Sequence, residues 1–267
     1  ILIFNSINMK KINTIFTSTI IGLAVFTSSC VNDLNVKPLD DVRVRKALNL
    51  AIDRKELCKA IGEDTEPAVN LVAKYMKDKS TGKYFVDEAA PPFEENLEEA
   101  KQLLTDAGYP GGKGFPTLTY NYPSLEMDSD TAQVIQEQLK KNLNISIKLN
   151  AQELQVNYTE RRAGSFDLCR MNWTADFADP YTYLSMLLSN STYNCSGIAD
   201  EKYDALVAQS DQETDPVKRG KLMHGVLYYS AFFYEKLQSD SSPDYRHNPK
   251  SGYRGIRIQT CRYTVIQ

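Results

Sequence analysis

Apolar and polar positions in the middle of the chain follow the two periods of regular secondary structure. Residues 117–122 alternate as a strand does, and apolar positions at helical spacing predict a helix from about 129 to 143. Residues 145–149 alternate again, a short helix is predicted over about 153–163, and a further apolar strand is predicted to end at Trp173. Strands that alternate with helices form βαβ units, so this order predicts an α/β fold with a mainly parallel sheet flanked by helices.

Apolar stripes at helical spacing also predict helices before this region. The first predicted helix begins at Asp40 or Asp41 and closes near Gly62. Asn96 is predicted to cap the next helix, and Gly108 to end it. The stripe of the first helix, which we expect to face the core, consists of Val44, Ala47, Leu48, Ala51 and Ile52.

The remaining segments divide into irregular chain and two late helices. The chain from Gly62 to about Pro92 has mixed charge and no clear period, so it is predicted to be irregular surface chain. The glycine-rich loop 110–114 lacks the Walker lysine-hydroxyl pair and follows no strand, which favours a plain turn over a phosphate cradle. Asp200 and Asp215 are predicted to cap the last two helices.

A polar turn after the last predicted strand is the first candidate for a binding site. Trp173, the only tryptophan, is followed three residues later by Asp176. Asp179 fits an N-cap and Pro180 the first turn of a helix. Ligands of open α/β sheets bind at the carboxyl ends of the strands, and an aromatic wall beside one charge suits a small polar ligand. The alternative, with Trp173 in the core and Asp176 as a solvated turn residue, stays open from these residues alone.

Composition excludes some partners. A chain of 267 residues, 42% hydrophobic and 24% charged, is typical of a globular protein with one large or two ordinary domains. The net charge is −3 and the lysines and arginines are scattered, which argues against a nucleic-acid partner. His224 and His247, the only two histidines, have no His or Cys neighbour at ligand spacing, so we expect neither a zinc site nor a cofactor.

The amino-terminal residues have the pattern of an export signal. Lys10 and Lys11 precede a mostly apolar segment, Ile12–Thr27, which is short for a membrane span. Small residues directly before Cys30 resemble the lipobox of bacterial lipoproteins, which implies that Cys30 is lipid-modified. The alternative is an ordinary cleaved signal that contains a cysteine. Residues 1–8 precede the expected start methionine and are left out of the fold prediction.

The other cysteines do not reveal a disulfide pattern. With Cys30 set aside, four remain and can pair in three ways, among which the sequence does not choose. These four are Cys58, Cys169, Cys195 and Cys261.

Two family resemblances follow from longer matches. Residues 30–39 are similar to the mature start of SusD/RagB-type outer-membrane lipoproteins, which bind glycans, but that resemblance stops at Asp40. From Asp41 to about Leu227 the chain resembles the carboxyl-terminal lobe of extracellular solute-binding proteins of family 5, the oligopeptide- and dipeptide-binding components of ABC importers. The matching segments, in order, are residues 41–55, 99–116, 136–142, 161–167, 173–180 and 203–207.

The family 5 resemblance implies a fold, a function and a location. The fold is one lobe of a type II periplasmic-binding-protein fold. Residues 1–40 are then a non-native start with a lipoprotein signal and linker, residues 41–235 the peptide-binding lobe, and residues 236–267 an unassigned and frameshifted tail. The implied function is that of a non-enzymatic subunit that binds short peptides and delivers them to membrane permease subunits. The implied location is the periplasm or cell envelope, and the lipid that the leader predicts on Cys30 would anchor the protein in the membrane.

The resemblance also assigns site residues. Asp176 matches the aspartate that pairs with the α-amino group of a peptide, with Phe177 in place of the usual tyrosine. Trp173 matches a tryptophan that lines a side-chain pocket. Arg170 and Arg161 match arginines near the ligand that can meet its carboxylate. An arginine can grip a carboxylate with two parallel hydrogen bonds, but the alternative for each is an ordinary surface ion pair.

The chain departs from the family at both ends. Family members bind between two lobes, and here the leader joins the later lobe directly between Leu39 and Asp41, so we expect the first lobe to be absent. Residues 240–267 match no pattern of the family. A single lobe leaves one face of a ligand in water, which weakens charge pairing. We therefore expect the chain to keep the lobe fold and to bind peptide weakly.

Two other classes of function remain to be weighed. An outer-membrane glycan-binding lipoprotein of the SusD type is supported only by the leader. A hydrolase would use Asp176 and Asp179 as a carboxylate pair, but Asp179 is better explained as a helix cap, and the sequence shows no nucleophile with an adjacent base and no metal set.

Overall fold

The computed structural model describes residues 37–62, 65–68, 70–88, 94–231 and 256–257. Its sheet has the strand order β2-β1-β3-β4, and every neighbouring pair is parallel. Tyr120 in β1 lies between Leu149 in β2 and Leu168 in β3. The prediction of a parallel sheet is therefore confirmed. The strands are β1 Leu118–Pro123, β2 Ile147–Gln152, β3 Leu168–Cys169 and β4 Ile256–Arg257.

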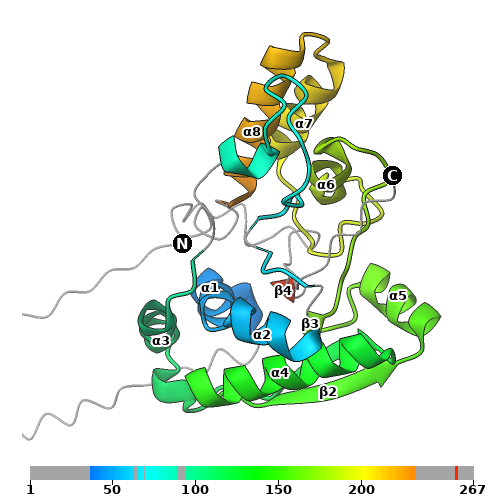
Figure 1. Ribbon diagram of the computed structural model, residues 1–267. Coiled ribbons are helices and arrows are strands. Elements are labelled where there is room, and N and C mark those ends of the chain that lie inside the picture. Colours follow the sequence, from blue (N-terminus) through cyan, green and yellow to red (C-terminus); the bar gives the residue numbers. More distant parts are fainter. Residues whose placement is uncertain (1–36, 63–64, 69, 89–93, 232–255, 258–267) are drawn as a thin grey trace, which may run out of the picture. The chain divides into compact units, whose positions relative to one another are not determined.

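Helices make up most of the remaining regular structure (Figure 1). Among the described residues we find none with the length and hydropathy that a membrane crossing requires. The α-helices are α1 Val42–Leu50, α2 Arg54–Ile61, α3 Leu97–Asp106, α4 Glu126–Leu143, α5 Leu154–Ala163, α6 Tyr181–Leu184, α7 Glu201–Gln212 and α8 Pro216–Ala231. Short 3-10 turns are η1 Pro38–Asp40, η2 Phe85–Glu88, η3 Pro110–Gly112 and η4 Ser185–Leu187.

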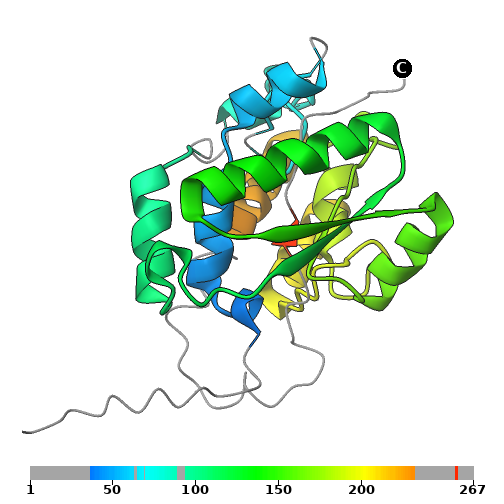
Figure 2. The same cartoon turned by 90° about the horizontal axis from the view of Figure 1, so that it is seen from below.

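Helices cover both faces of the sheet (Figure 2). Tyr120 is fully buried in a core that includes residues of α4. Asn121, the next residue of β1, points to the opposite face because strand side chains alternate, and there its amide donates to Glu160 of α5 at 3.1 Å. The prediction that helices flank the sheet is therefore confirmed.

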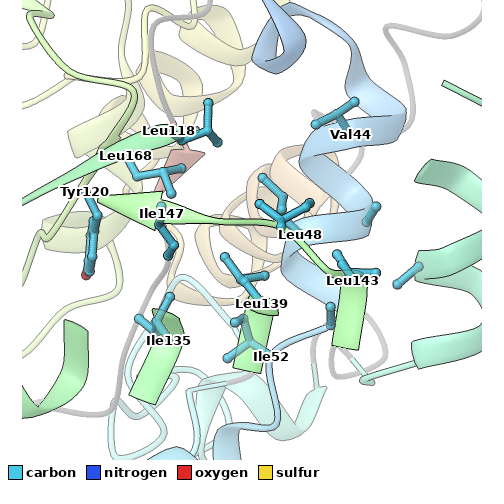
Figure 3. Packing of buried hydrophobic residues seen from close by; sticks show 14 of the residues in the cluster. Val44, Leu48, Ile52, Leu118, Tyr120, Ile135, Leu139, Leu143, Ile147 and Leu168 are labelled. Atoms are coloured by element: carbon cyan, nitrogen blue, oxygen red, sulfur yellow. The ribbon is translucent and has the colours of Figure 1, made fainter. Parts of the chain in front are cut away.

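The main hydrophobic core lies between the sheet and α1, α3 and α4 (Figure 3). Leu48 of α1 and Leu139 of α4 are fully buried in it, as is Leu168 of β3. Burial of such aliphatic side chains stabilises the fold by about 1.5–3 kcal/mol each before the entropy cost of ordering them. The predicted stripe faces this core, since Val44 and Leu48 of α1 and Ile52, which follows α1, are fully buried.

A second core joins the late helices to the segment before α3. Tyr203 of α7 and Val226 of α8 are fully buried in it together with Phe85 of η2. Tyr203 also donates its hydroxyl to the carbonyl of Leu184 in α6 at 2.7 Å. Trp173 packs against the edge of this core. The tryptophan of the polar turn is thus supported by the second core rather than by the main one.

The predicted first helix is in fact two helices, so that prediction is corrected. α1 ends at Leu50, and Asp53 caps α2 by accepting the backbone N–H of Glu56 at 2.8 Å. Arg54 is only 4% exposed and donates to the carbonyls of Asn49 and Ile52. A capping aspartate and an arginine that binds the free carbonyls of α1 favour a break here. The predicted ends of this helical region are correct, because Asp41 caps α1 and Gly62 follows α2.

The chain from Gly62 to about Pro92 is not surface chain as predicted, since Val72, Ala73 and Phe85 are fully buried in the second core. The predicted helix caps and the glycine-rich turn are confirmed. Asn96, Asp200 and Asp215 accept backbone N–H groups at the starts of α3, α7 and α8. The loop 110–114 is a turn, in which Gly112 has φ 75° and leaves no room for a side chain against the backbone carbonyls of Leu143 and Asn144. α4 begins three residues earlier than predicted.

The chain termini lie mostly outside the described residues. Cys30 and the rest of the predicted leader fall there, as does most of the predicted tail. Within the tail, Ile256–Arg257 forms β4 and pairs with β3. The boundaries of the predicted domains therefore stay predictions, with a short strand now known in the part that had no assignment.

Candidate functional site

The polar turn lies between β3 and α6, but the preceding strand is shorter than predicted. β3 ends at Cys169. The backbone N–H of Arg170 still donates to the carbonyl of Asn121 in β1 at 2.8 Å, but residues 171–174 belong to no strand. The prediction of a strand as far as Trp173 was therefore wrong, and its apolar residues are explained by packing against the second core. Pro180 stands at the N-cap of α6, one position before the predicted first turn, which is within the ordinary variation of assigned helix ends.

The hydroxyl of Thr182 connects the indole to the carboxylate. Thr182 Oγ1 accepts from Trp173 Nε1 at 3.4 Å and from the backbone N–H of Asp176 at 3.2 Å, and it donates to Asp176 Oδ2 at 3.4 Å. A hydroxyl has one donor and two acceptor sites, so these contacts use all three. They are long for hydrogen bonds, but Thr182 is only 2% exposed. Burial thus fixes the group that holds Trp173 and Asp176 on one turn.

Asp176 presents its carboxylate to solvent. The residue is exposed, and within the described part of the chain the hydrogen bond to its carboxylate is the long one from Thr182. An ionised carboxylate has about four lone-pair sites, so most of its capacity to accept hydrogen bonds is unused here. Asp176 is therefore available to a cationic group from outside.

Aromatic residues lie on the same turn as this carboxylate and beside it. Trp173 is half-buried, and its ring packs edge-on against Tyr193 with 4.6 Å between centroids. Tyr193 is 45% exposed and Phe177, next to Asp176, is 50% exposed. Large apolar rings that face water beside one charge are typical of a binding surface. Trp173 packs against the second core and stays partly exposed, so it has features of a core residue and of a site wall.

Arg170 is buried in an internal ion pair. Its Nε donates to Asp128 Oδ1 of α4 at 3.0 Å, and its Nη1 donates to the carbonyl of Met171 at 2.7 Å. The side chains of Arg170 and Asp128 are 4% and 8% exposed. In this structure Arg170 therefore holds the segment before the turn against α4, and a direct contact with a ligand carboxylate stays a prediction.

Arg161 lies near the same segment without a carboxylate partner in the described residues. Its guanidinium stacks over the ring of Tyr158 at 4.8 Å, and its Nη1 donates to the carbonyl of Arg170 at 3.3 Å. The Nε atom is buried and makes no hydrogen bond within the part of the chain that is described. A buried donor without a partner is costly, so Arg161 has spare hydrogen-bonding capacity that an anion would use.

Asp179 is occupied by three donors from different segments. It accepts from Arg219 of α8 at 2.7 and 3.0 Å, from Lys79 at 3.2 Å, and from the backbone N–H of Tyr181 at 3.0 Å. Burial alone would raise the pKa of Asp179, but these hydrogen bonds outweigh it and hold the pKa below its ordinary value of 3.8. Asp179 is therefore a charged anchor for the turn, and the geometry does not favour it as the proton donor of a hydrolytic pair.

The anchor predicts a pH dependence of stability. Because the folded-state pKa of Asp179 is lowered, its contribution is complete above the unfolded pKa near 3.8 and is lost as the pH falls through the folded value. We expect Asp179→Asn to lower the free energy of unfolding by roughly 1.5–3 kcal/mol at pH 7. The difference from the native chain should shrink below about pH 4. Urea unfolding at several pH values measures this difference in unfolding free energy, with Asp130→Asn, at an exposed position, as control. A difference that does not change with pH would contradict the role of Asp179 as a charged anchor.

Cysteine chemistry contributes little to the site. Cys58 is disulfide-bonded, and Cys169 and Cys195 carry free thiols. Burial raises the pKa of Cys169 to about 12, so this thiol is not an activated nucleophile.

Sequence reasoning missed the supporting residues of the turn. No sequence motif includes Thr182, Asp128 or Arg219. The helices on which they lie were predicted from the spacing of apolar residues, which gives polar residues no role. For Asp128 there was a usable signal: it lies seven and eleven residues before Ile135 and Leu139, on the same helical face. A charge on a buried face needs a partner, and here the partner is Arg170.

Comparison with known proteins extends over most of the described region. Residues 6–195 match the family described as "Bacterial extracellular solute-binding proteins, family 5 Middle". The oligopeptide-binding protein OppA of Bacillus subtilis is 31% identical over 191 residues, which are 70% of this chain and 34% of that protein. The Escherichia coli protein named "Probable deoxycholate-binding periplasmic protein YgiS" is 33% identical over 190 residues, which are 71% of this chain and 35% of that protein.

Solved structures agree with this match. The Haemophilus influenzae OppA complex with RPPGFSPFR has a TM-score of 0.64 at 29% identity, over 74% of this chain and 39% of that one. The predicted fold, one lobe of a periplasmic binding protein, is thereby confirmed. The chain spans about a third of the length of the curated relatives just named. No comparison supports the SusD-type alternative.

Proposed function

Because the chain belongs to family 5 of the bacterial extracellular solute-binding proteins, we propose that it is the peptide-binding lobe of a solute-binding subunit that serves an ABC importer. The family is one of binding proteins and not of enzymes. The observation that carries the proposal is the exposed carboxylate of Asp176, held beside Trp173 by the buried hydroxyl of Thr182. In this role Asp176 receives the α-ammonium group of a peptide and Trp173 contacts a side chain.

The charge of Asp176 favours peptides over other ligands of the family. Relatives carry names for different ligands, and deoxycholate, which appears in one of them, is an anion. A carboxylate that faces the ligand repels an anion and attracts an ammonium group. RPPGFSPFR, the ligand of the similar Haemophilus influenzae structure, is a peptide. A free amino terminus is the group that fits Asp176 best.

Arg161 and Arg170 have different parts in this proposal. Arg161, with its stacked guanidinium and unused Nε, is the better candidate to meet a ligand carboxylate. Arg170, paired with Asp128, acts by holding the segment that leads into the turn. A guanidinium suits a carboxylate because it can donate two parallel hydrogen bonds.

We expect this lobe to bind peptide weakly. Asp176 faces water, which screens both charges of a carboxylate–ammonium pair, and a second wall that excludes water would strengthen the pairing. Calorimetry that shows micromolar or tighter binding of a tripeptide to this chain would contradict this expectation.

Calorimetric titration with trialanine and N-acetyl-trialanine tests the peptide proposal. The free-amine peptide should bind several-fold more tightly than the acetylated one, because only the former carries a cation for Asp176. Asp176→Asn should remove this preference while Asp130→Asn, another exposed aspartate, keeps it. Equal affinity for the two peptides, or an unchanged preference in Asp176→Asn, would rule out the assigned role.

The proposed location follows from the leader. We infer an exported protein of the periplasm or cell envelope, anchored through lipid on Cys30, which works with membrane permease subunits. Family members are periplasmic or extracellular, which supports export. The anchor rests on the sequence before Cys30 alone, and incorporation of labelled palmitate by the native chain but not by Cys30→Ser tests it.

A further inference from the structure

Three side chains with metal-binding groups meet away from the polar turn. They are Asp78, Glu88 at the end of η2, and His224 of α8, and their candidate ligand atoms all lie within 4.8 Å of one another. We propose that this cluster, which we call the 78/88/224 site, binds a divalent transition-metal ion of the Zn²⁺ type. The peptide proposal makes no use of these residues, so the two stand independently.

The distance between the two nearest ligand atoms fits a metal. His224 Nε2 lies 3.3 Å from Asp78 Oδ2. Two ligands bound at about 2.0–2.1 Å to a tetrahedral Zn²⁺ are about 3.3–3.4 Å apart. The metal then stands to one side of the line that joins them, where the remaining positions are open to Glu88 and a water molecule.

The geometry of this contact suits a cation that lies between the two atoms. His224 Nε2 is buried, and within the described residues it has no hydrogen-bond partner despite its distance from Asp78. Where Nε2 carries no proton, its lone pair faces that of the carboxylate oxygen, and facing lone pairs repel. A hydrogen bond would need its proton close to the line between the two atoms. A metal ion, which lies off that line, satisfies both atoms in this arrangement.

Neighbouring groups hold the ligands in place, as the supporting contacts of metal sites usually do. Asp78 is 2% exposed, and its other oxygen, Oδ1, accepts from the backbone N–H of Ser80 at 2.7 Å and from the Ser80 hydroxyl at 2.6 Å. Oδ2 is thereby directed at His224. The imidazole packs edge-on against Phe85, with 4.2 Å between ring centroids. Both nearest ligands are therefore fixed before a metal arrives.

Glu88 supplies the third ligand by a small side-chain movement. It is now paired with Lys83 at 3.1 Å and accepts from the Thr81 hydroxyl at 2.8 Å. The Lys83 side chain is 70% exposed, and ion pairs in water contribute little. Glu88 can therefore exchange Lys83 for a divalent cation at little cost, and its interaction with the cation is stronger.

The donor set points to the class of metal. One imidazole nitrogen with two carboxylate oxygens suits Zn²⁺ and related transition metals. Ca²⁺ and Mg²⁺ prefer oxygen ligands and more of them, so both should bind more weakly. The bound ion would fasten the segment around Asp78 to α8. Lys79 lies in the segment around Asp78 and Arg219 lies in α8, and both pair with Asp179.

Gly220 makes the approach of Asp78 to α8 possible. A Cβ on Gly220 would lie 2.8 Å from Asp78 Oδ2 and 3.1 Å from the Ser80 hydroxyl oxygen, whereas a Cβ on Gly225 of the same helix would meet nothing within 4 Å. Replacing either glycine by alanine raises the helix propensity of α8 to a similar degree. Gly220→Ala and Gly225→Ala are therefore a matched pair, of which only Gly220→Ala is expected to displace Asp78.

Calorimetric titration of the chelator-treated full chain with Zn²⁺ tests the proposal. The native chain should bind one equivalent, and Ca²⁺ and Mg²⁺ should bind more weakly. His224→Gln and Glu88→Gln should weaken binding by roughly tenfold or more, since loss of even a supporting contact costs about 10–100-fold. Gly220→Ala should weaken binding and Gly225→Ala should not. His247→Gln and Cys195→Ser, which remove other candidate ligands, should bind as the native chain does.

Each contrary result is decisive. Absence of Zn²⁺ binding by the native chain overturns the proposal, and so does native affinity in Glu88→Gln. Loss of binding in His247→Gln or Cys195→Ser places the metal elsewhere. If His224→Gln does not fold, the metal affinities of Glu88→Gln and of the two glycine variants still test the proposal, because these variants keep His224 and Asp78. Equal effects of Gly220→Ala and Gly225→Ala also contradict the site.

Discussion

Replacing Asp128 by alanine is expected to lower the free energy of unfolding by about 3–5 kcal/mol, because the change leaves Arg170 buried without its anion. The two side chains are 8% and 4% exposed, and the Nε to Oδ1 distance is 3.0 Å. Neither group can regain its hydration without opening the contact between α4 and the segment that follows β3. Such an effect is a large fraction of the stability of an ordinary domain.

A control on the same helix separates this effect from loss of any aspartate. Asp130 is exposed, so Asp130→Ala should change the unfolding free energy by no more than about 0.5 kcal/mol. Adding Arg170→Met to Asp128→Ala should restore part of the loss, since replacing both members of a buried pair by apolar groups is often nearly neutral. Urea unfolding of the four chains measures these values. A small effect of Asp128→Ala would show that the pair is open in solution.

Replacing Leu139 by alanine is expected to destabilise the fold by about 2–5 kcal/mol, because it leaves a cavity in the main core. Leu139 is fully buried on the face of α4 that points to the sheet and to α1 (Figure 3). The interior has no spare side chain to fill the space. Loss of buried apolar area and the new cavity both contribute to the cost.

Leu125 provides the matched control for this change. It precedes α4 directly and is 54% exposed, so Leu125→Ala should cost no more than about 0.5 kcal/mol. The comparison uses the same chemical change, once at the buried face of α4 and once at its exposed N-cap. Thermal or urea unfolding measures both variants. Equal costs for the two would mean that α4 does not pack on the sheet as described.

Much of the fold followed from local signals in the sequence. Alternation and helical spacing located β1, β2, α3, α4 and α5, and cap residues such as Asn96 and Asp200 located helix starts. These signals are local, because a cap binds an N–H group two or three residues away. The first helix was predicted wrongly for the same reason. The apolar stripe runs as far as Ile52, and no glycine or proline follows it before Gly62. The break instead depends on Arg54 donating to the carbonyls of Asn49 and Ile52.

The site was predictable in part. Motifs of the family placed Asp176 and Trp173 on one turn, and the structure brings both to Thr182. The partners that hold the turn were not predictable, because they lie far away in the sequence. Arg170 pairs with a residue 42 positions earlier, and Asp179 pairs with one 40 positions later. Spacing rules could not indicate the proposed 78/88/224 site, since His224 meets carboxylates from a segment before α3.

The most direct test of the account follows the indole N–H of Trp173 by NMR during titration with trialanine. Trp173 is the only tryptophan, so the spectrum has one indole N–H signal, and this group donates to the same hydroxyl that contacts Asp176. The account predicts that the signal moves saturably with the free-amine peptide and stays in place with N-acetyl-trialanine or in Asp176→Asn. A signal that does not move while others do, or that moves equally with both peptides, would contradict it.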